Sequence, residues 1–144
     1  MRVLVQRCDS ASVKVDNKIV GSIDKGMMIL VGFTQTDTSE NIDYMVDKVL
    51  NLRIYDDEAG VMNKSILETG GSILSVSQFT LYADSRKGRR PSYINALNGE
   101  QAIKLYDEFN QKLMKHIHVE TGVFGAEMKV ELINDGPITI MLEK

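Results

Sequence analysis

The chain is short of the residues that most often build cross-links, metal sites and catalytic triads. Cys8 is the only cysteine among 144 residues, so no internal disulfide and no thiol cluster for zinc can form. We interpret Cys8 as a small buried apolar residue. His116 and His118 are the only histidines, and no carboxylate or cysteine pattern accompanies them. The sequence therefore predicts no metal site, and it allows a Ser-His-Asp triad only if one of these histidines serves as its base.

Long apolar runs and an excess of positive charge are also missing. No apolar run approaches the ~18 residues that a membrane span needs, and residues 1–7 do not resemble a signal peptide. We therefore expect a cytoplasmic protein without membrane contact. The net charge of −3 and the pI of 5.4 argue against a nucleic-acid binder that depends on bulk electrostatics. They still allow a protein that contacts only the end of an RNA through one local basic patch.

What is present is the composition of an ordinary folded domain. The hydrophobic content of 43% and the charged content of 26% exclude a disordered chain. A chain of this length buries roughly two thirds of its unfolded surface, enough for one core. No linker, low-complexity tract or internal repeat divides the sequence, so we expect a single domain spanning residues 1–144.

Two segments carry apolar residues at the three- and four-residue steps of an amphipathic helix. The first stripe consists of Ile42, Met45, Val46, Val49 and Leu50. The second stripe consists of Ala102, Leu105, Tyr106, Phe109, Leu113 and Ile117. The polar residues 34–39 offer N-caps to the first helix, and Asn98 with Gln101 forms a capping pair at the start of the second.

The remaining apolar segments are typical of strands, because they alternate or carry β-branched residues. They are residues 2–7, 12–20, 27–31, 73–81, 127–133 and 138–142. Asp16-Asn17 marks a turn inside the second of them, and residues 27–31 are apolar throughout, as in a strand covered on both faces. Several strands with only two long helices predict an α+β fold. We expect a mixed, mostly antiparallel sheet that curls into a barrel-like shape.

The segment Ser75–Asp84 contains the first candidate chemistry. In a strand, Ser77 and Phe79 share one face while Gln78 and Thr80 share the other, so both faces mix polar and apolar groups. A buried hydroxyl or amide costs ~1–3 kcal/mol unless it is hydrogen-bonded. These groups therefore either bond to neighbouring backbone at a strand end or line a site.

A loop of concentrated positive charge follows directly. Arg86, Lys87, Arg89 and Arg90 occupy four of five consecutive positions. Most charge runs are solvated surface, but loops held by a rigid strand often carry ligand-binding groups. The sequence leaves both interpretations open, a solvated face and a phosphate-binding loop.

The run Asn134-Asp135-Gly136-Pro137 is a strong turn signal between two of the expected strands. Taken alone, it indicates a plain connector. A third informative segment is Thr121–Met128, which joins the second helix to the last strands. These segments become specific only when they are considered together.

Together they resemble the D-aminoacyl-tRNA deacylases, a family once called the D-tyrosyl-tRNA deacylases. Residues 77–81 with the loop 86–91 are similar to the family's first signature. Residues 134–139 are similar to its second signature, the Gly-cisPro motif, and residues 121–128 are similar to a third segment. Residues 1–7 and the apolar run 26–32 are also similar to the family, so the resemblance covers essentially the whole chain.

The resemblance implies a homodimer with active sites at the subunit interface, and it implies no cofactor. It assigns catalysis to Ser77, Gln78, Phe79 and Thr80, substrate binding to Gly136, Pro137, Phe124 and Met128, and binding of the tRNA acceptor end to Arg86, Lys87, Arg89 and Arg90. The bond between Gly136 and Pro137 is expected to be cis, in a strained insert rather than an ordinary turn. Each such insert is expected to reach into the pocket of the partner subunit.

The implied activity is hydrolysis of the ester that joins a D-amino acid, or mischarged glycine, to the terminal ribose of tRNA. The Gly-cisPro motif would reject L-aminoacyl-tRNA as chiral proofreading, because Gly136 lacks a Cβ and its backbone can approach the substrate closely. Either Thr80 is a nucleophile, or backbone donors near Phe79 and Thr80 act with the ribose 2′-hydroxyl. The scarcity of histidine favours the second mechanism. A non-catalytic RNA-binding module and a small-metabolite esterase using Thr80 or Ser77 stay open.

Overall fold

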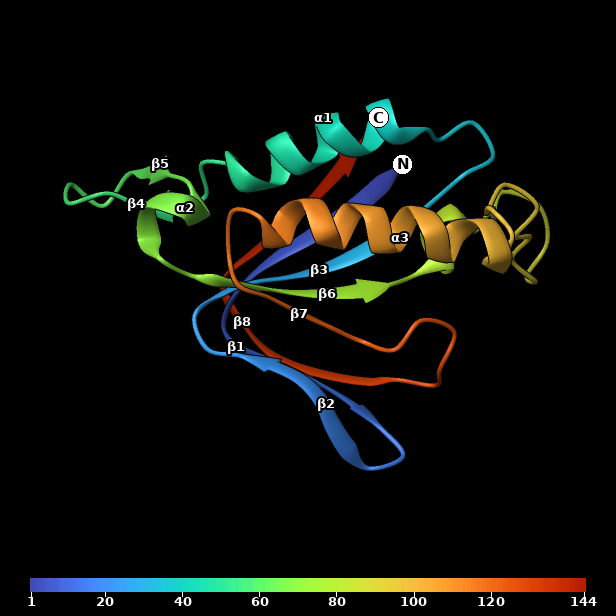
Figure 1. Cartoon of the computed structure of the whole chain (residues 1–144), viewed down its shortest axis with the longest axis horizontal. Coiled ribbons are helices and arrows are strands. Elements are labelled where there is room, and N and C mark those ends of the chain that lie inside the picture. Colours follow the sequence, from blue (N-terminus) through green and yellow to red (C-terminus); the bar gives the residue numbers. More distant parts are fainter.

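Six strands of the computed structural model, which describes residues 1–144, form one curled, nearly closed sheet (Figure 1). They are β1 (Arg2–Val15), β2 (Lys18–Ile23), β3 (Gly26–Gly32), β6 (Ser72–Ser77), β7 (Val119–Thr121) and β8 (Lys129–Glu143). Their order is β2-β1-β3-β6-β7, and β8 pairs with the other edge of β1. The pairs β3–β6 and β6–β7 are parallel, and the pairs made by β1 are antiparallel. The expected mixed, mostly antiparallel, barrel-like sheet is confirmed.

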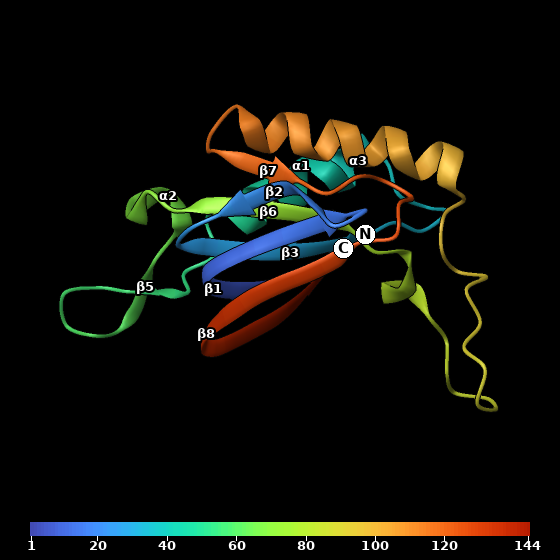
Figure 2. The same cartoon turned by 90° about the horizontal axis from the view of Figure 1, so that it is seen from below.

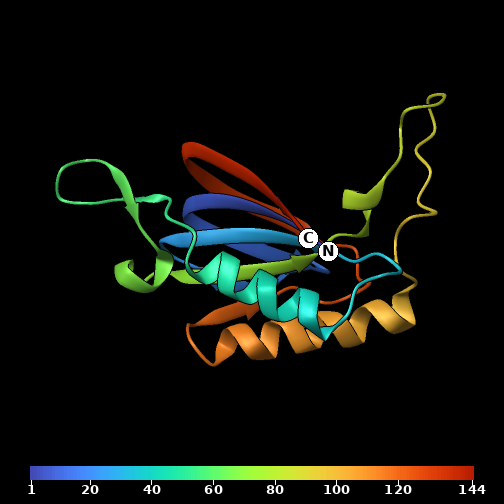
Figure 3. The ribbon, with the colours of Figure 1, turned by 90° about the horizontal axis from the view of Figure 1, so that it is seen from above.

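Two long helices cover one face of this sheet, as Figures 1 and 3 show. They are α1 (Ser39–Leu50) and α3 (Gly99–Met114). Thr38 caps α1, and the Asn98 side chain accepts a hydrogen bond from the Gln101 N–H at the start of α3. Both expected helices and the capping pair are therefore confirmed. Only the end of the second stripe differs, because α3 stops at Met114, before Ile117.

A short excursion between α1 and β6 has no counterpart among the expected elements. It contains the hairpin β4 (Tyr55–Asp56) and β5 (Met62–Lys64), followed by one helical turn, α2 (Ile66–Thr69). Such short elements lack the length over which a hydrophobic period can be recognised. In Figure 3 this excursion lies at the opposite end of the molecule from the segment 84–98.

β1 is one continuous strand rather than the two separate segments expected from the sequence. The prediction of a turn at Asp16 and Asn17 is confirmed, because both residues adopt positive φ angles of 50° and 62° between β1 and β2. β1 pairs with β3 through Arg2–Cys8 and with β2 through Ala11–Val15. Its other edge pairs with β8 from end to end.

β8 is likewise continuous, so the interpretation of residues 134–137 as a plain connector is wrong. Its register with β1 skips residues 135–138, since Asn134 pairs with Cys8 and Thr139 with Gln6. The Asn134 side-chain amide donates to the Arg7 carbonyl at 2.8 Å and to the Ile138 carbonyl at 3.0 Å. This amide bridges the insertion, and pairing with β1 resumes on both sides of it.

The core lies between the helices and the sheet. Its largest fully buried side chains include Met1, Met27, Ile29, Ile42, Met45, Ile73, Phe109 and Leu113. Cys8 is buried in a smaller cluster inside the curled sheet, and this burial raises the pKa of its thiol to about 11. The interpretation of Cys8 as a buried apolar residue is thus confirmed. None of the helices combines the length and the apolar character that crossing a membrane requires.

Candidate active site

A cavity of about 490 Å³ opens where β3 and β6 end, beside the start of α3 and the loop that follows β7. Its lining consists of Val31, Gly32, Phe33, Val76, Ser77, Gln78, Phe79, Leu97, Gly99, Ala102, Phe124, Gly125, Ala126, Met128 and Val130. None of these side chains is ionisable. The walls are mostly apolar, and a few polar groups lie at one end, which is the usual character of a small-molecule site.

Ser77 and Gln78 lie at that polar end, although the segment 77–80 is not the strand expected from the sequence. β6 ends at Ser77, and the chain turns into a short 3₁₀-helix, η1 (Phe79–Tyr82). β3 ends at Gly32, so the Gln78 N–H makes the last bond to it, at 2.7 Å from the Val31 carbonyl. With no strand left to pair with, the backbone curls instead of continuing.

This curl leaves backbone donors beside the cavity. The first hydrogen bond of the turn runs from the Leu81 N–H to the Gln78 carbonyl. The N–H groups of Phe79 and Thr80 come before that bond, so the turn itself supplies no acceptor for them, as at any helix start. Ser77, Gln78 and Phe79 line the cavity.

Thr80 is placed differently from its three neighbours. It is not part of the lining, and its hydroxyl accepts a hydrogen bond from the Gln78 side-chain amide at 2.5 Å. His116 and His118 follow the far end of α3, where His118 pairs with Glu120 at 3.0 Å. No histidine lies in the cavity lining to serve as a base for a hydroxyl nucleophile.

Phe124 and Met128 line the cavity opposite β6. The Phe124 ring packs on Tyr106 of α3 with ring centroids 5.8 Å apart, and the Tyr106 hydroxyl donates to the Ser75 carbonyl at 2.8 Å. Burial raises the pKa of Tyr106, which keeps this hydroxyl a donor. The aromatic wall is therefore fixed to β6, the strand that leads into the polar end.

Gly136 and Pro137 lie elsewhere. They occupy the insertion in β8, and neither lines the cavity of the same chain. Their peptide bond is cis, as the resemblance implied, and Gly136 has a φ of 112°. The buried Arg7 guanidinium anchors the insertion through an ion pair with Asp135 at 2.8 Å. Both Gly136 and Pro137 are exposed.

The basic segment forms part of a long arm, residues 84–98, that projects from the body of the protein (Figure 2). Asp84 holds Arg86 through two side-chain hydrogen bonds, of 2.9 and 2.7 Å, and these lower the pKa of Asp84 to about 2. Lys87, Arg89 and Arg90 are exposed and take part in no ion pair. Three of the four expected basic residues are thus free to meet an anion.

Sequence reasoning missed two contributors to this region. The first is the start of α3, where Leu97, Gly99 and Ala102 line the cavity. The capping pair predicted where this helix begins but not what it faces. The second is Tyr93, whose ring packs against Phe79 with centroids 5.1 Å apart. No spacing or motif indicates this contact, because it joins the arm to η1 only in the folded chain.

Comparison with known proteins identifies the family. The model of the family D-Tyr-tRNA(Tyr) deacylase matches residues 4–143. The D-aminoacyl-tRNA deacylase of Listeria monocytogenes serotype 4a (strain HCC23) is 58% identical over 144 residues, which cover 99% of this chain and 95% of that protein. The protein of the same name from Clostridium perfringens (strain SM101 / Type A) is 56% identical, with 99% and 97% covered.

Two solved structures resemble this one. The c-Myc DNA Unwinding Element Binding Protein has a TM-score of 0.95 and 40% identity, with 100% of this chain and 99% of that chain covered. A probable eukaryotic D-amino acid tRNA deacylase has a TM-score of 0.85 at 21% identity, with 98% and 97% covered, and shows the shared fold. With a family model that matches almost every residue, the chain belongs to the D-Tyr-tRNA(Tyr) deacylase family, a family of hydrolases.

Proposed function

We propose that this protein hydrolyses the ester bond of D-aminoacyl-tRNA, and of mischarged glycyl-tRNA, in the cytoplasm, as a quality control of translation. The observation that carries the proposal is the cavity without ionisable side chains, which has backbone donors at one end and is lined by residues of η1 and α3, the two elements that the basic arm connects. Family membership and the names of the bacterial relatives support the same activity.

The proposed chemistry uses the substrate's own reactivity. An aminoacyl ester is already activated, so the protein has to orient the attack and stabilise the oxyanion rather than supply a strong nucleophile. The N–H groups of Phe79 and Thr80 are the donors suited to the oxyanion. The ribose 2′-hydroxyl of the substrate assists, because the lining supplies no base. Thr80 is a poor nucleophile here, since its hydroxyl bonds to an amide that cannot accept a proton.

A homodimer completes the proposed site. Gly136 and Pro137 are exposed and lie outside the cavity of their own chain, so they reach a cavity only when a second copy presents them. At Gly136 the backbone approaches the substrate closely, so an L side chain on the substrate's Cα clashes with this backbone. A D-side chain points away, and glycine has none to reject. A thousandfold preference needs only about 4 kcal/mol, within reach of one steric clash.

The proposal is tested by release of amino acid from tRNA charged with D-tyrosine, L-tyrosine or glycine. We expect hydrolysis of the first and third and protection of the second. An RNA-binding module would bind all three without releasing amino acid. An esterase for small metabolites would hydrolyse simple esters without a preference for tRNA, and either outcome would reject the proposal.

The mechanism has its own test. Thr80→Ala is expected to retain substantial activity, because the backbone N–H of residue 80 remains. A tRNA that ends in 2′-deoxyadenosine is expected to be bound but hydrolysed very slowly. A Thr80→Ala protein that folds and binds tRNA normally yet shows no turnover would instead assign the nucleophile to Thr80.

A further inference from the structure

The most exposed aromatic contact of the molecule involves Phe79, which lines the cavity, and Tyr93 of the arm. The chain has no Trp and only nine Phe and Tyr residues. Three of their side chains are largely exposed, on Phe79, Tyr93 and Tyr44. Tyr44 of α1 lies beside the ammonium groups of Lys48 and Lys144. Phe79 and Tyr93 instead form an edge-to-face pair. Phe79 is 56% exposed and Tyr93 is 42% exposed although they contact each other.

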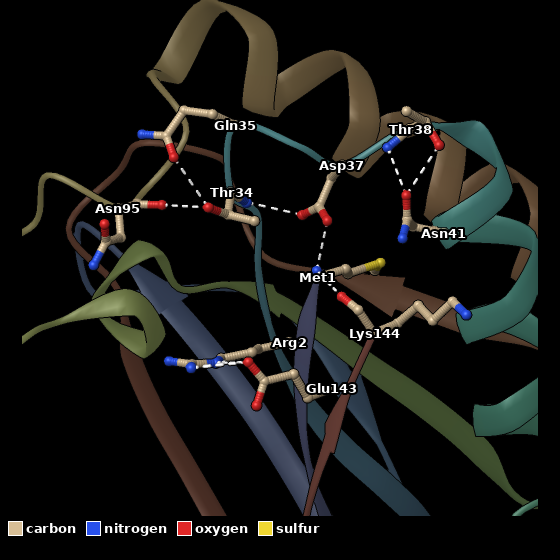
Figure 4. A network of polar contacts seen from close by, with 10 residues as sticks. All are labelled: Met1, Arg2, Thr34, Gln35, Asp37, Thr38, Asn41, Asn95, Glu143 and Lys144. Atoms are coloured by element: carbon tan, nitrogen blue, oxygen red, sulfur yellow. Dashed lines mark hydrogen bonds and ion pairs between the residues drawn. The ribbon is translucent and has the colours of Figure 1, made fainter.

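The two segments that carry this pair are each bound to the body of the protein by polar contacts, and Figure 4 shows those of Thr34 and Arg2 with Asn95, Asp37 and Glu143. On the arm, the Thr34 hydroxyl donates to the Asn95 carbonyl at 2.6 Å, and the Gln35 amide donates to the Ile94 carbonyl at 2.7 Å. Thr34 is itself fixed, because its N–H donates to Asp37 at 2.8 Å. The backbone next to Tyr93 is therefore bound to the segment that precedes α1.

The Phe79 side is anchored at the same end of the sheet. Arg2 donates to the Leu81 carbonyl at 2.8 Å and stacks over the Tyr82 ring at 4.6 Å, and both of these residues belong to η1. Glu143 pairs with the same guanidinium at 2.9 Å. Two exposed rings on separate segments are thus preorganised, which lowers the entropy lost when a ligand binds.

The charges around the pair select the kind of ligand. Tyr93 follows the bridge between Asp84 and Ser92, which closes the basic part of the arm. The unpaired cations of Lys87, Arg89 and Arg90 therefore lie in the loop that this bridge closes, directly before Tyr93 in the sequence. Aromatic faces that stack bases, next to cations that meet phosphates, are the combination by which proteins hold single-stranded nucleic acid. A purely apolar partner would gain no favourable interaction with these cations.

We infer that Phe79 and Tyr93 form a stacking platform for the base of the nucleotide that carries the amino acid, the terminal base of the tRNA acceptor end. The inference rests on the proposed function, because it needs the ester to enter the cavity that Phe79 lines. The base then stacks on the pair, and the preceding phosphates face the basic arm. Tyr93 is a binding residue for substrate, outside the cavity and outside the chemistry.

The inference is tested by binding of two uncharged tRNAs, one intact and one whose terminal nucleotide lacks its base. Tyr93→Ala is expected to weaken binding of the intact tRNA by roughly 5- to 150-fold, the effect of removing one base-stacking ring. It should leave binding of the abasic tRNA unchanged. Tyr93→Phe keeps the ring and should bind as wild type does. Ile94→Ala is the matched control, because Ile94 is the next residue and is 78% exposed.

Three results for Tyr93→Ala overturn the platform. They are unchanged affinity for both tRNAs, equal weakening of both, and a changed oligomeric state in sedimentation, which would assign the ring to an interface between copies. A weakening by Ile94→Ala as large as that by Tyr93→Ala overturns it as well. Hydrolysis of D-aminoacyl-tRNA by the wild-type protein is measured separately. A protein that hydrolyses this substrate but binds intact and abasic tRNA equally well keeps the proposed function and loses the platform.

Discussion

Gly136→Ala tests the insertion in β8 through two separable effects, on stability and on activity. The φ of 112° lies where L side chains rarely occur, and a Cβ built there meets Ile138 Cγ1 at 2.8 Å. A residue in such a backbone region costs of order 1–3 kcal/mol, and forcing extra atoms into a packed site costs typically another 1–3 kcal/mol. We therefore expect the free energy of unfolding to fall by about 2–6 kcal/mol.

Gly60→Ala is the matched control. Gly60 also has a positive φ, of 75°, but a Cβ there meets nothing within 4 Å. Only the backbone cost applies, about 1–2 kcal/mol. Urea unfolding of both variants with equal m-values gives the comparison. Equal destabilisation of the two variants would refute the contact with Ile138.

The activity of the same variants is measured where both are folded. A domain usually has about 5–15 kcal/mol of stability, so Gly136→Ala is expected to remain native at room temperature. If the insertion meets the substrate, deacylation of D-aminoacyl-tRNA should fall by on the order of 100-fold, the usual consequence of displacing a positioning group by about 1 Å. Gly60→Ala should retain full activity. Wild-type rates in folded Gly136→Ala would remove this glycine from the site.

The basic arm supports two further predictions. Replacing Lys87, Arg89 and Arg90 together by Ala should reduce the slope of log affinity for tRNA against log salt by roughly 2 to 3, at about 0.7–0.9 for each phosphate that is no longer neutralised; an unchanged slope would exclude the arm from tRNA binding. Arg86→Ala should raise the pKa of Asp84 from about 2 towards its ordinary 3.8, as NMR titration of its carboxyl would follow. Because the folded pKa is lowered, the Asp84–Arg86 pair stabilises the arm above about pH 4, and this stabilisation disappears as the pH falls through about 2.

The sequence predicted the elements whose pattern is long and regular. The stripes from Ile42 to Leu50 and from Ala102 to Leu113 predicted both long helices, because a period of 3.6 residues that persists over more than two turns is typical of an amphipathic helix. It failed where one pattern fits two structures. Phe79 and Thr80 continue the alternation of β6, yet the chain curls there because β3 has ended. Whether residues 79 and 80 continue the strand depends on where β3 ends, and β3 is distant from them in the sequence.

The site was predictable where a motif carried it. Five residues that the resemblance assigned to the site line one cavity, and their roles in catalysis and substrate binding stay predictions: Ser77, Gln78, Phe79, Phe124 and Met128. Residues that enter through tertiary contact alone were not found: Tyr93 reaches η1 only after the arm folds back. The turn signal at 134–137 was wrongly interpreted as a plain connector, because nothing local indicates that the Asn134 amide bridges an insertion within one continuous strand.

The pairing of β1 with β8 sets the order in which the protein can fold during synthesis. Residues 2–15 are synthesised before every other strand, and their partners along one whole edge are residues 129–143. Until those residues emerge, β1 can pair with β2 and β3 only, and its other edge exposes unpaired N–H and C=O groups. Contacts between residues this far apart in sequence also form slowly, because the chain must lose the entropy of a long loop before the contacts can stabilise it. Closure of the sheet therefore has to wait for β8, and until then β1 carries an edge that a second nascent chain, or a chaperone, can occupy.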